Sequence, residues 1–295
     1  MSVHFGITIP HFGRNAQPGM VETVARQAEE LGFDSVWASD HVIVPVGEGY
    51  IPDYFYDPLV VMTAAAAVTE RVEIGVSVLV IPYRDPILTG KMLATLDQMS
   101  RGRIILGTGV GWLEQEFDAL NADFHQRGAV CDEYLDVMQA LWTTDPTTFE
   151  GHWTNFSEMR ANPKPVREPF PIWVGGNGPP AIKRAAQRGT GWHPINLSLA
   201  EFTAGVESYH AACRDGGRPT GAICLRAMPG GRNVPQGDRT PFTGAPADVA
   251  QDVDTFAAAG MTHILFSPPV ADLEQLEEEM QTIAKEVRPL VGAAP

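Results

Sequence analysis

The sequence predicts an α/β protein of the closed (β/α)8 TIM barrel class. Three observations predict it: a length of 295 residues, eight alternations of a short apolar segment with a helical pattern, and polar residues or glycines directly after the apolar segments. Each parallel crossover needs its own helix, so this alternation favours a barrel. We expect one domain over residues 1–295.

A doubly wound open sheet is the alternative fold. Its dinucleotide-binding fingerprint would follow the first strand, where this chain has Pro10-His-Phe-Gly13 instead. The missing fingerprint and the count of eight units both favour the barrel.

The eight units follow one another in chain order. Strands are expected at 3–9, 35–38, 74–81, 103–106, 172–174, 191–193, 223–228 and 263–266. Helices are expected at 18–31, 57–68, 85–99, 127–142, 179–188, 199–215, 247–259 and 273–287. Gly32 is predicted to end the first helix, while Asp57 and the Asp85-Pro86 pair are predicted to begin the second and third.

Two segments break the alternation. Residues 143–171 are rich in aromatic residues and prolines, and we interpret them as an inserted hairpin or lid after the fourth unit. Residues 229–243 are expected to form a second irregular loop.

Composition excludes several classes of function. The formal net charge of −15 argues against sequence-independent nucleic-acid binding, which needs a basic face. The longest apolar run, Pro58 to Val68, is shorter than the ~20 residues that cross a bilayer, so we expect no membrane partner and a cytoplasmic protein. The three cysteines and the histidines lack metal-ligand spacing, so no metal site is predicted.

The third predicted strand carries one hydroxyl in an apolar run. Ser77 lies between Val76 and Val78, and a buried hydroxyl must be satisfied by the protein or by a ligand. Both interpretations stand on the sequence.

A barrel gathers the residues that follow its strands at one mouth. We therefore expect a set of polar residues and glycines to meet there: His11, Asp40, His41, Ser77, the glycines of 107–111 and of 175–178, His193 and Ser267.

The Asp40-His41 pair is the sharpest candidate for chemistry. A histidine at a strand end can move a proton, and a nearby carboxylate can fix its tautomer. Adjacent strand residues point in opposite directions, so the alternative is a loop-capping Asp40 beside a surface histidine. Glu114 and Glu116 are expected on a solvated helix face.

The two glycine segments can bring the backbone close to a ligand. Gly107 to Gly111 has no lysine in Walker spacing, which argues against nucleoside triphosphate binding. Gly175 to Gly178 precedes a helix that begins with prolines, and this arrangement fits either an anion site or a plain tight turn.

Four ordered motifs together resemble the bacterial luciferase-like family. They are Gly32-Phe-Asp-Ser-Val-Trp-Ala-Ser-Asp-His41, Gly75-Val-Ser-Val-Leu79, Gly107-Thr-Gly-Val-Gly-Trp112 and Trp173-Val-Gly-Gly176. The Asp-His pair and the third strand look most like the branch that uses the deazaflavin coenzyme F420. That branch includes F420-dependent glucose-6-phosphate dehydrogenase and methylene-tetrahydromethanopterin reductase.

The resemblance implies a cofactor site at the barrel mouth. It implies a cis peptide between Ser77 and Val78, forming a bulge behind the deazaflavin ring, with Asp40 and His41 in contact with the ring. The remaining implied cofactor-binding residues are Val110 and Gly111 along the ring, and Gly175, Gly176, Asn177, Gly178 and Ala181 along the phosphate-bearing tail.

The resemblance also implies an activity. We expect an F420-dependent oxidoreductase that transfers hydride between C5 of the deazaflavin and a small organic substrate, with His41 moving the proton and with a homodimeric assembly. An FMN-dependent monooxygenase and a non-catalytic flavin-binding barrel are the alternatives. Trp112 stands where the sugar-phosphate dehydrogenases carry a glutamate, so glucose-6-phosphate is a poor candidate substrate.

Overall fold

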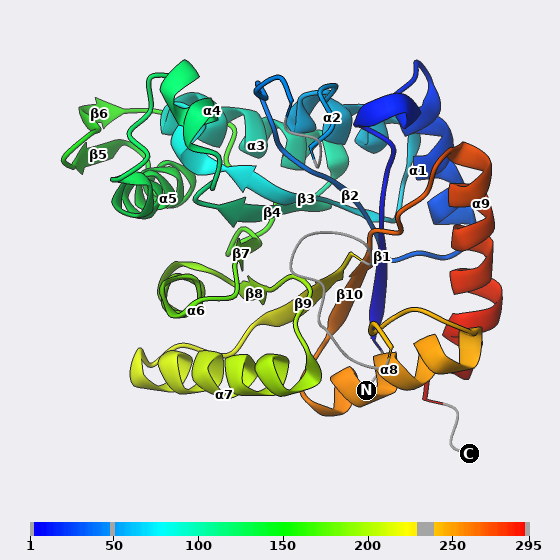
Figure 1. Ribbon diagram of the computed structural model, residues 1–295. Helices are drawn as coiled ribbons and strands as arrows, with labels where there is room; N and C mark the ends of the chain where they lie inside the picture. The colour runs from blue at the N-terminus through cyan, green and yellow to red at the C-terminus, as the bar shows by residue number, and fades with distance from the viewer. Residues whose placement is uncertain (1–2, 48–50, 229–238, 293–295) are drawn as a thin grey trace.

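The eight predicted strands close into a parallel barrel (Figure 1). The computed structural model describes residues 3–47, 51–228 and 239–292. Around the barrel the strands run in the order β1-β10-β9-β8-β7-β4-β3-β2, and neighbouring strands pair in parallel. The predicted fold class is therefore confirmed, and the open sheet is excluded. The assignment of the whole chain to one domain stays a prediction.

The observed elements fall within a few residues of the expected ones. The barrel strands are β1 His4–Thr8, β2 Ser35–Ala38, β3 Glu73–Val80, β4 Ile104–Gly109, β7 Ile172–Gly175, β8 Gly191–His193, β9 Ala222–Ala227 and β10 His263–Phe266. The helices are α1 Met20–Glu30, α2 Pro58–Val68, α3 Pro86–Ser100, α4 Glu114–Ala119, α5 Arg127–Thr143, α6 Pro179–Arg188, α7 Leu199–Asp215, α8 Pro246–Ala258 and α9 Leu273–Thr282. The last helix continues as a π-helical turn over Ile283–Val287.

The predicted helix ends have the expected chemistry. The Asp57 side chain accepts hydrogen bonds from the first N–H groups of α2, and Asp85 does the same for α3. Gly32 follows α1 with a φ of +83°, a left-handed conformation that favours glycine. Helix α4 holds Glu114 and Glu116, which were expected on a helix face, although no bounds were predicted for this helix. The loop expected at 229–243 lies outside the described residues as far as 238.

The barrel interior is filled by side chains. Trp37, Ile105, Trp173, Cys224 and Leu265 form a buried cluster inside it. Glycine makes room for the largest of them, because a Cβ at position 75 would lie 2.3 Å from the Trp37 ring. This apolar layer forms a solid floor below the barrel mouth.

Residues 143–171 contain an antiparallel hairpin outside the barrel, beside α5 (Figure 1). Its strands are β5 Thr147–Glu150 and β6 Asn155–Met159. The Glu133 carboxylate on α5 accepts backbone hydrogen bonds from His152, Trp153 and Thr154, which ties the hairpin turn to the helix. A hairpin is thus present, while its status as an insertion and its role as a lid stay predictions.

Candidate active site

Strand β3 carries a bulge where it reaches the mouth. The peptide bond between Ser77 and Val78 is cis, as the resemblance implied. The pairing of β3 with β4 shifts register between Val76 and Leu79. The third strand therefore has the bulge that the resemblance implied, while its contact with a cofactor ring stays a prediction.

The glycines of the neighbouring strands accommodate this bulge. A Cβ at Gly109 would lie 2.4 Å from Val78 Cγ2, and a Cβ at Gly175 would lie 2.6 Å from Val78 Cγ1. A Cβ at Gly107 would lie 2.0 Å from the backbone oxygen of Val76. These three glycines are needed for packing against β3, a role that the sequence did not indicate.

The Ser77 hydroxyl is satisfied by protein groups. It lies 2.7 Å from His193 Nε2, while His193 Nδ1 lies 2.7 Å from the carbonyl oxygen of Cys224. Because Nδ1 must donate to that carbonyl, Nε2 accepts and the Ser77 hydroxyl donates. Burial lowers the pKa of His193 to about 4, so the ring is neutral at physiological pH.

Arg226 on β9 joins several of the predicted mouth residues. Its guanidinium donates to the Ser77 carbonyl oxygen at 2.5 Å, to Ser39 Oγ at 3.2 Å and to Ser267 Oγ at 3.1 Å. The Ser39 N–H in turn donates to His11 Nε2 at 2.7 Å. The predicted meeting of these strand ends is thus confirmed, but the sequence reasoning missed the arginine that connects them. Its signal was a cation within the otherwise apolar strand AICLRA.

Asp40 is buried and forms an ion pair with Arg84. Its carboxylate accepts from both terminal nitrogens of Arg84 at 2.5 and 2.8 Å, and from the Val80 N–H at 2.9 Å. Arg84 also reaches Asp57 at 3.1 Å. Burial raises the pKa of Asp40 above its usual range, and the Arg84 charge opposes that rise. Asp40 therefore links the end of β3 to the loop after β2.

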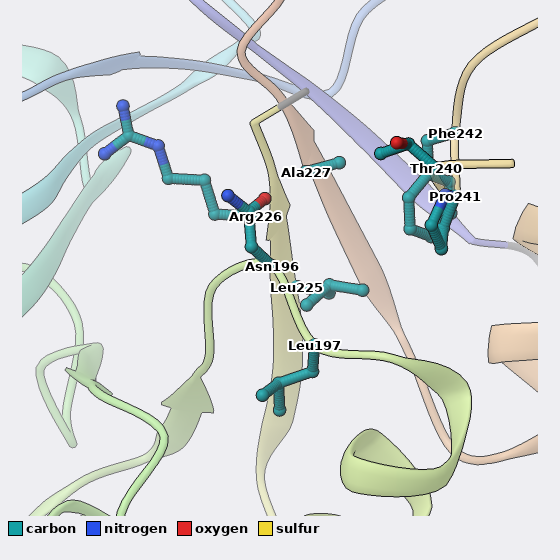
Figure 2. Close-up of a pocket in the computed structure, with 8 residues that line it drawn as sticks. All are labelled: Asn196, Leu197, Leu225, Arg226, Ala227, Thr240, Pro241 and Phe242. Carbon is teal, nitrogen blue, oxygen red and sulfur yellow. The ribbon is translucent and has the colours of Figure 1, made fainter. Parts of the chain in front are cut away.

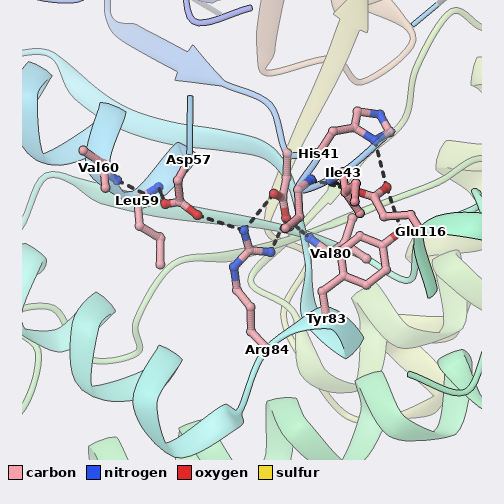
Figure 3. A network of polar contacts seen from close by, with 11 residues as sticks. His41, Ile43, Asp57, Leu59, Val60, Val80, Tyr83, Arg84 and Glu116 are labelled. Carbon is pink, nitrogen blue, oxygen red and sulfur yellow. Dashed lines mark hydrogen bonds and ion pairs between the residues drawn. The ribbon is translucent and has the colours of Figure 1, made fainter. Parts of the chain in front are cut away.

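His41 is held by a different carboxylate. Its Nδ1 lies 2.9 Å from Glu116 Oε2 on α4, so Asp40 and His41 each bind a separate partner (Figure 3). The expectation that Glu116 is solvated is wrong, because the residue is only 1% exposed. Glu114, whose side chain is 54% exposed, fits that expectation. Residues two apart on a helix point to nearly opposite sides, and this was the available signal.

Glu116 is fixed by further donors. Its carboxylate accepts from Val42 N–H at 2.5 Å, from Ile43 N–H at 3.2 Å and from the Tyr83 hydroxyl at 3.0 Å. Burial would raise the pKa of Glu116, but the hydrogen bonds from His41 and the backbone outweigh it and hold that pKa below its usual value. The carboxylate is thus ionised near neutral pH and accepts a hydrogen bond from the Nδ1–H of His41. His41 Nε2 makes no hydrogen bond within the part of the chain that the structure describes.

Apolar side chains surround His41. Its ring lies 5.1 Å from that of Phe55 and 5.9 Å from that of Trp112, measured between centroids. Val42, Ile43 and Trp112 are 50%, 52% and 45% exposed. This rim suits an apolar ligand better than a charged one.

The glycine turn after β7 is partly occupied by its own contacts. The Asn177 side chain donates to the Ile195 carbonyl oxygen at 2.8 Å and accepts from the Ile195 N–H at 2.9 Å. Both polar atoms of this side chain are thus already hydrogen-bonded. Helix α6 begins with Pro179 and Pro180, which have no N–H. An anion here would depend on the backbone of residues 175–178 and on Ala181, whose N–H already bonds to the Gly178 carbonyl at 3.0 Å. Gly111 on the β4 side has a φ of +79°.

A separate pocket of about 240 Å³ lies beside β9 (Figure 2). Its lining residues are Asn196, Leu197, Leu225, Arg226, Ala227, Thr240, Pro241 and Phe242. The Arg226 side chain extends away from Leu225 and Phe242, so the guanidinium belongs to the mouth rather than to this pocket. The 240 Å³ include open solvent, and the enclosed space of about 10 Å³ is far smaller than common cofactor sites.

The comparisons with known proteins agree with the bulged barrel. A family model described as luciferase-like monooxygenase matches residues 3–229. The chain belongs to this family. Among its relatives, an uncharacterised protein of Mycobacterium tuberculosis is 31% identical over 77% of this chain and 86% of its own length. An F420-dependent glucose-6-phosphate dehydrogenase of Amycolatopsis mediterranei is 34% identical over 59% of this chain and 52% of its own length.

Solved structures of luciferase-like form share the fold over nearly the whole chain. An F420-dependent secondary alcohol dehydrogenase in complex with an F420-acetone adduct has a TM-score of 0.82 at 19% identity, covering 99% of both chains. The oxygenating constituent of 3,6-diketocamphane monooxygenase from Pseudomonas putida, in complex with FMN, has a TM-score of 0.79 at 18% identity, covering 99% of both chains. At these identities the likeness establishes the fold alone.

Proposed function

We propose that the chain is an F420-dependent oxidoreductase that transfers hydride between C5 of the deazaflavin and a small organic substrate. The observation that carries the proposal is the state of His41. Its Nδ1 is bound to a buried, ionised carboxylate, and its Nε2 has no partner among the described residues. A histidine held in this way can give or take a proton at one defined atom.

The residues of the mouth fit a flat, electron-rich ring. Val78 and the half-buried Val110 offer apolar surface, and Arg226 offers positive charge. Such a ring supplies or accepts the hydride itself, and the protein supplies binding, orientation and electrostatics. We propose Ser77, Val78, Val110 and Gly111 as ring contacts, and the backbone of Gly175, Gly176, Asn177, Gly178 and Ala181 as contacts of the tail.

His41 is proposed as the proton donor or acceptor for the substrate oxygen. Glu116 fixes the His41 tautomer and would stabilise a positive charge on the ring when Nε2 takes up a proton. Asp40 is proposed to act through its contact with Val80, which holds the end of β3 in place. Its ion pair with Arg84 occupies the carboxylate that would otherwise face a ligand.

F420 is preferred to FMN because the curated relatives with an assigned activity include F420-dependent enzymes, such as the dehydrogenase from Amycolatopsis mediterranei. The chain spans about half the length of that relative, so its activity is not transferred whole. FMN is the alternative cofactor, since an FMN-bound monooxygenase shares the fold.

The substrate is proposed to be an apolar alcohol, carbonyl compound or unsaturated compound. The exposed rim of Val42, Ile43 and Trp112 would contact such a molecule. A sugar phosphate fits this rim poorly, because its anionic group would meet apolar side chains.

Equilibrium binding tests the cofactor assignment. The purified apoprotein is titrated with F420 and, separately, with FMN, and each dissociation constant is measured by fluorescence. We expect F420 to bind at least about tenfold more tightly, a difference of about 1.4 kcal/mol. Tighter binding of FMN would favour the monooxygenase. Tight F420 binding without hydride exchange across a panel of alcohols and enones would favour a non-catalytic barrel.

We also propose a homodimer in the cytoplasm. The outer faces of α2 and α3 expose Val60, Leu88, Met92 and Met99 at 65%, 66%, 49% and 67%. Residues 88, 92 and 99 share one face of α3, and exposed apolar side chains on one face favour contact with a second copy. Light scattering should give twice the chain mass, and a monomer at micromolar concentration would exclude the dimer.

No helix within the described ranges is long and apolar enough to cross a membrane.

A further inference from the structure

The side chain of Arg226 crosses the barrel mouth from β9 to the opposite strands. It donates to the carbonyl oxygen and hydroxyl of Ser77 at the end of β3, to Ser39 after β2 and to Ser267 after β10. In the barrel order β3 lies opposite β9, β2 is the neighbour of β3, and β10 pairs directly with β9. The guanidinium is therefore held rigidly above the apolar interior layer.

All of these partners are uncharged. A guanidinium has five N–H groups, and the four hydrogen bonds leave one of them without an acceptor among the described residues. No carboxylate lies within 4.0 Å of Arg226 in that part of the chain. Arg84 and Arg184, by contrast, are each paired with an aspartate.

The titratable groups that the structure describes around Arg226 do not compensate its charge. Burial lowers the pKa of Arg226 to about 10, which leaves it cationic near neutral pH. Burial, with a smaller contribution from the Arg226 charge, lowers the pKa values of His11 and His193 to about 4. Within the described ranges, Arg226 thus places a fixed positive charge beside two neutral imidazoles.

A partly buried cation without a counter-ion favours a ligand that brings negative charge. Arg226 binds Ser77, the residue proposed to back the ring, so its charge lies beside the ring site. A hydride carries one unit of negative charge onto whatever ring accepts it. The positive charge therefore discriminates between the two redox states of a bound cofactor.

We propose that Arg226, held in place by the hydroxyls of Ser39, Ser77 and Ser267, forms an anion-stabilising subsite that makes the barrel bind the reduced cofactor more tightly than the oxidised one. The inference rests on the proposed function, because it concerns the same ring site. It adds a residue that sets the direction in which hydride transfer is favoured. Arg226 acts through its charge and moves no proton.

The test compares the affinities for oxidised and reduced F420, measured by anaerobic titration. The ratio of the two dissociation constants reports the charge at the ring and requires no substrate. In Arg226→Gln this ratio should shift toward the oxidised form by about tenfold or more, since a nearby positive charge attracts the more negative, reduced ring more strongly. Arg226→Lys keeps the charge and should keep most of the wild-type preference.

Two further variants separate charge from structural damage. Ser39→Asp places a carboxylate beside Arg226 without removing it, and it should shift the ratio in the same direction as Arg226→Gln. This variant also serves if Arg226→Gln fails to fold. Arg214→Gln, on the exposed end of α7, removes a remote positive charge and should leave the ratio unchanged.

Each outcome decides the matter. If wild type binds both forms and the ratio stays within twofold in Arg226→Gln and Ser39→Asp, the subsite is refuted and the proposed function stands. If wild type binds neither form, the proposed function fails and the subsite fails with it. A shift in both variants, absent in Arg214→Gln, supports the subsite.

Discussion

At the scale of single residues, the candidate site depends on which carboxylate each charged group binds. The sequence identified His41, because it follows a strand end. It did not reveal that Glu116, 75 residues further along the chain, holds the imidazole. Sequence spacing indicates neighbours on one element, whereas this contact joins the loop after β2 to helix α4. The exposure of Glu114 and the burial of Glu116 became clear only from the packing of α4.

We predict that His41→Ala lowers turnover by about 10²- to 10⁴-fold, the usual contribution of a proton-transferring side chain, and changes cofactor affinity little. Glu116→Gln should cause a smaller loss and alter the pH profile of turnover, because an amide cannot stabilise a charged imidazole as a carboxylate does. Steady-state kinetics over a range of pH values measures both effects.

Glu114→Gln is the matched control on the same helix, and it should behave as wild type. Wild-type turnover in His41→Ala would remove His41 from the mechanism. Equal losses in Glu114→Gln and Glu116→Gln would show that the effect of Glu116 is general damage to α4.

At the scale of elements, strand β3 determines its neighbours. The bulge places Val78 where only glycine fits at positions 109 and 175. The sequence suggested these glycines as ligand contacts, since a glycine permits close approach by any group. The Val78 side chain approaches both of them, and their role as ligand contacts stays a prediction. That distinction requires the register of β3 against β4, which depends on the bulge.

We expect His193, at the end of strand β8, to make the stability of the fold depend on pH. The folded pKa of His193 is about 4 and its ordinary value is 6.5. Between these values the unfolded chain binds a proton that the folded chain does not, so the free energy of unfolding falls as the pH falls from 6.5 toward 4. For His193 alone the full loss is about 3 kcal/mol.

Urea denaturation at several pH values between 4 and 7 measures this effect. In His193→Gln the slope of the unfolding free energy against pH should decrease, by an amount that corresponds to at most one bound proton. His125→Gln is the control, because the His125 side chain is 83% exposed, and its slope should match wild type. An unchanged slope in His193→Gln would mean that His193 is not held neutral in the fold.

At the scale of the whole molecule, the alternation of apolar segments and helical patterns was sufficient to predict the barrel. Each barrel strand is buried on both faces, so it is a short apolar run that can be recognised from the local sequence. The mouth was predictable only as a set of strand ends. The hydrogen bonds that join these strand ends involve Arg226, Asp40 and Glu116. They connect residues far apart in the sequence, and no local pattern specifies them.

The central claim is that a redox ring binds in the mouth against the β3 bulge, between Arg226 and His41. A crystal structure of the protein with bound F420 tests it most directly. We predict that the ring lies against Val78 and that His41 Nε2 faces the space where a substrate would meet the ring. A ring bound elsewhere, such as in the pocket beside Phe242, or a His41 imidazole turned away from it, would contradict the account.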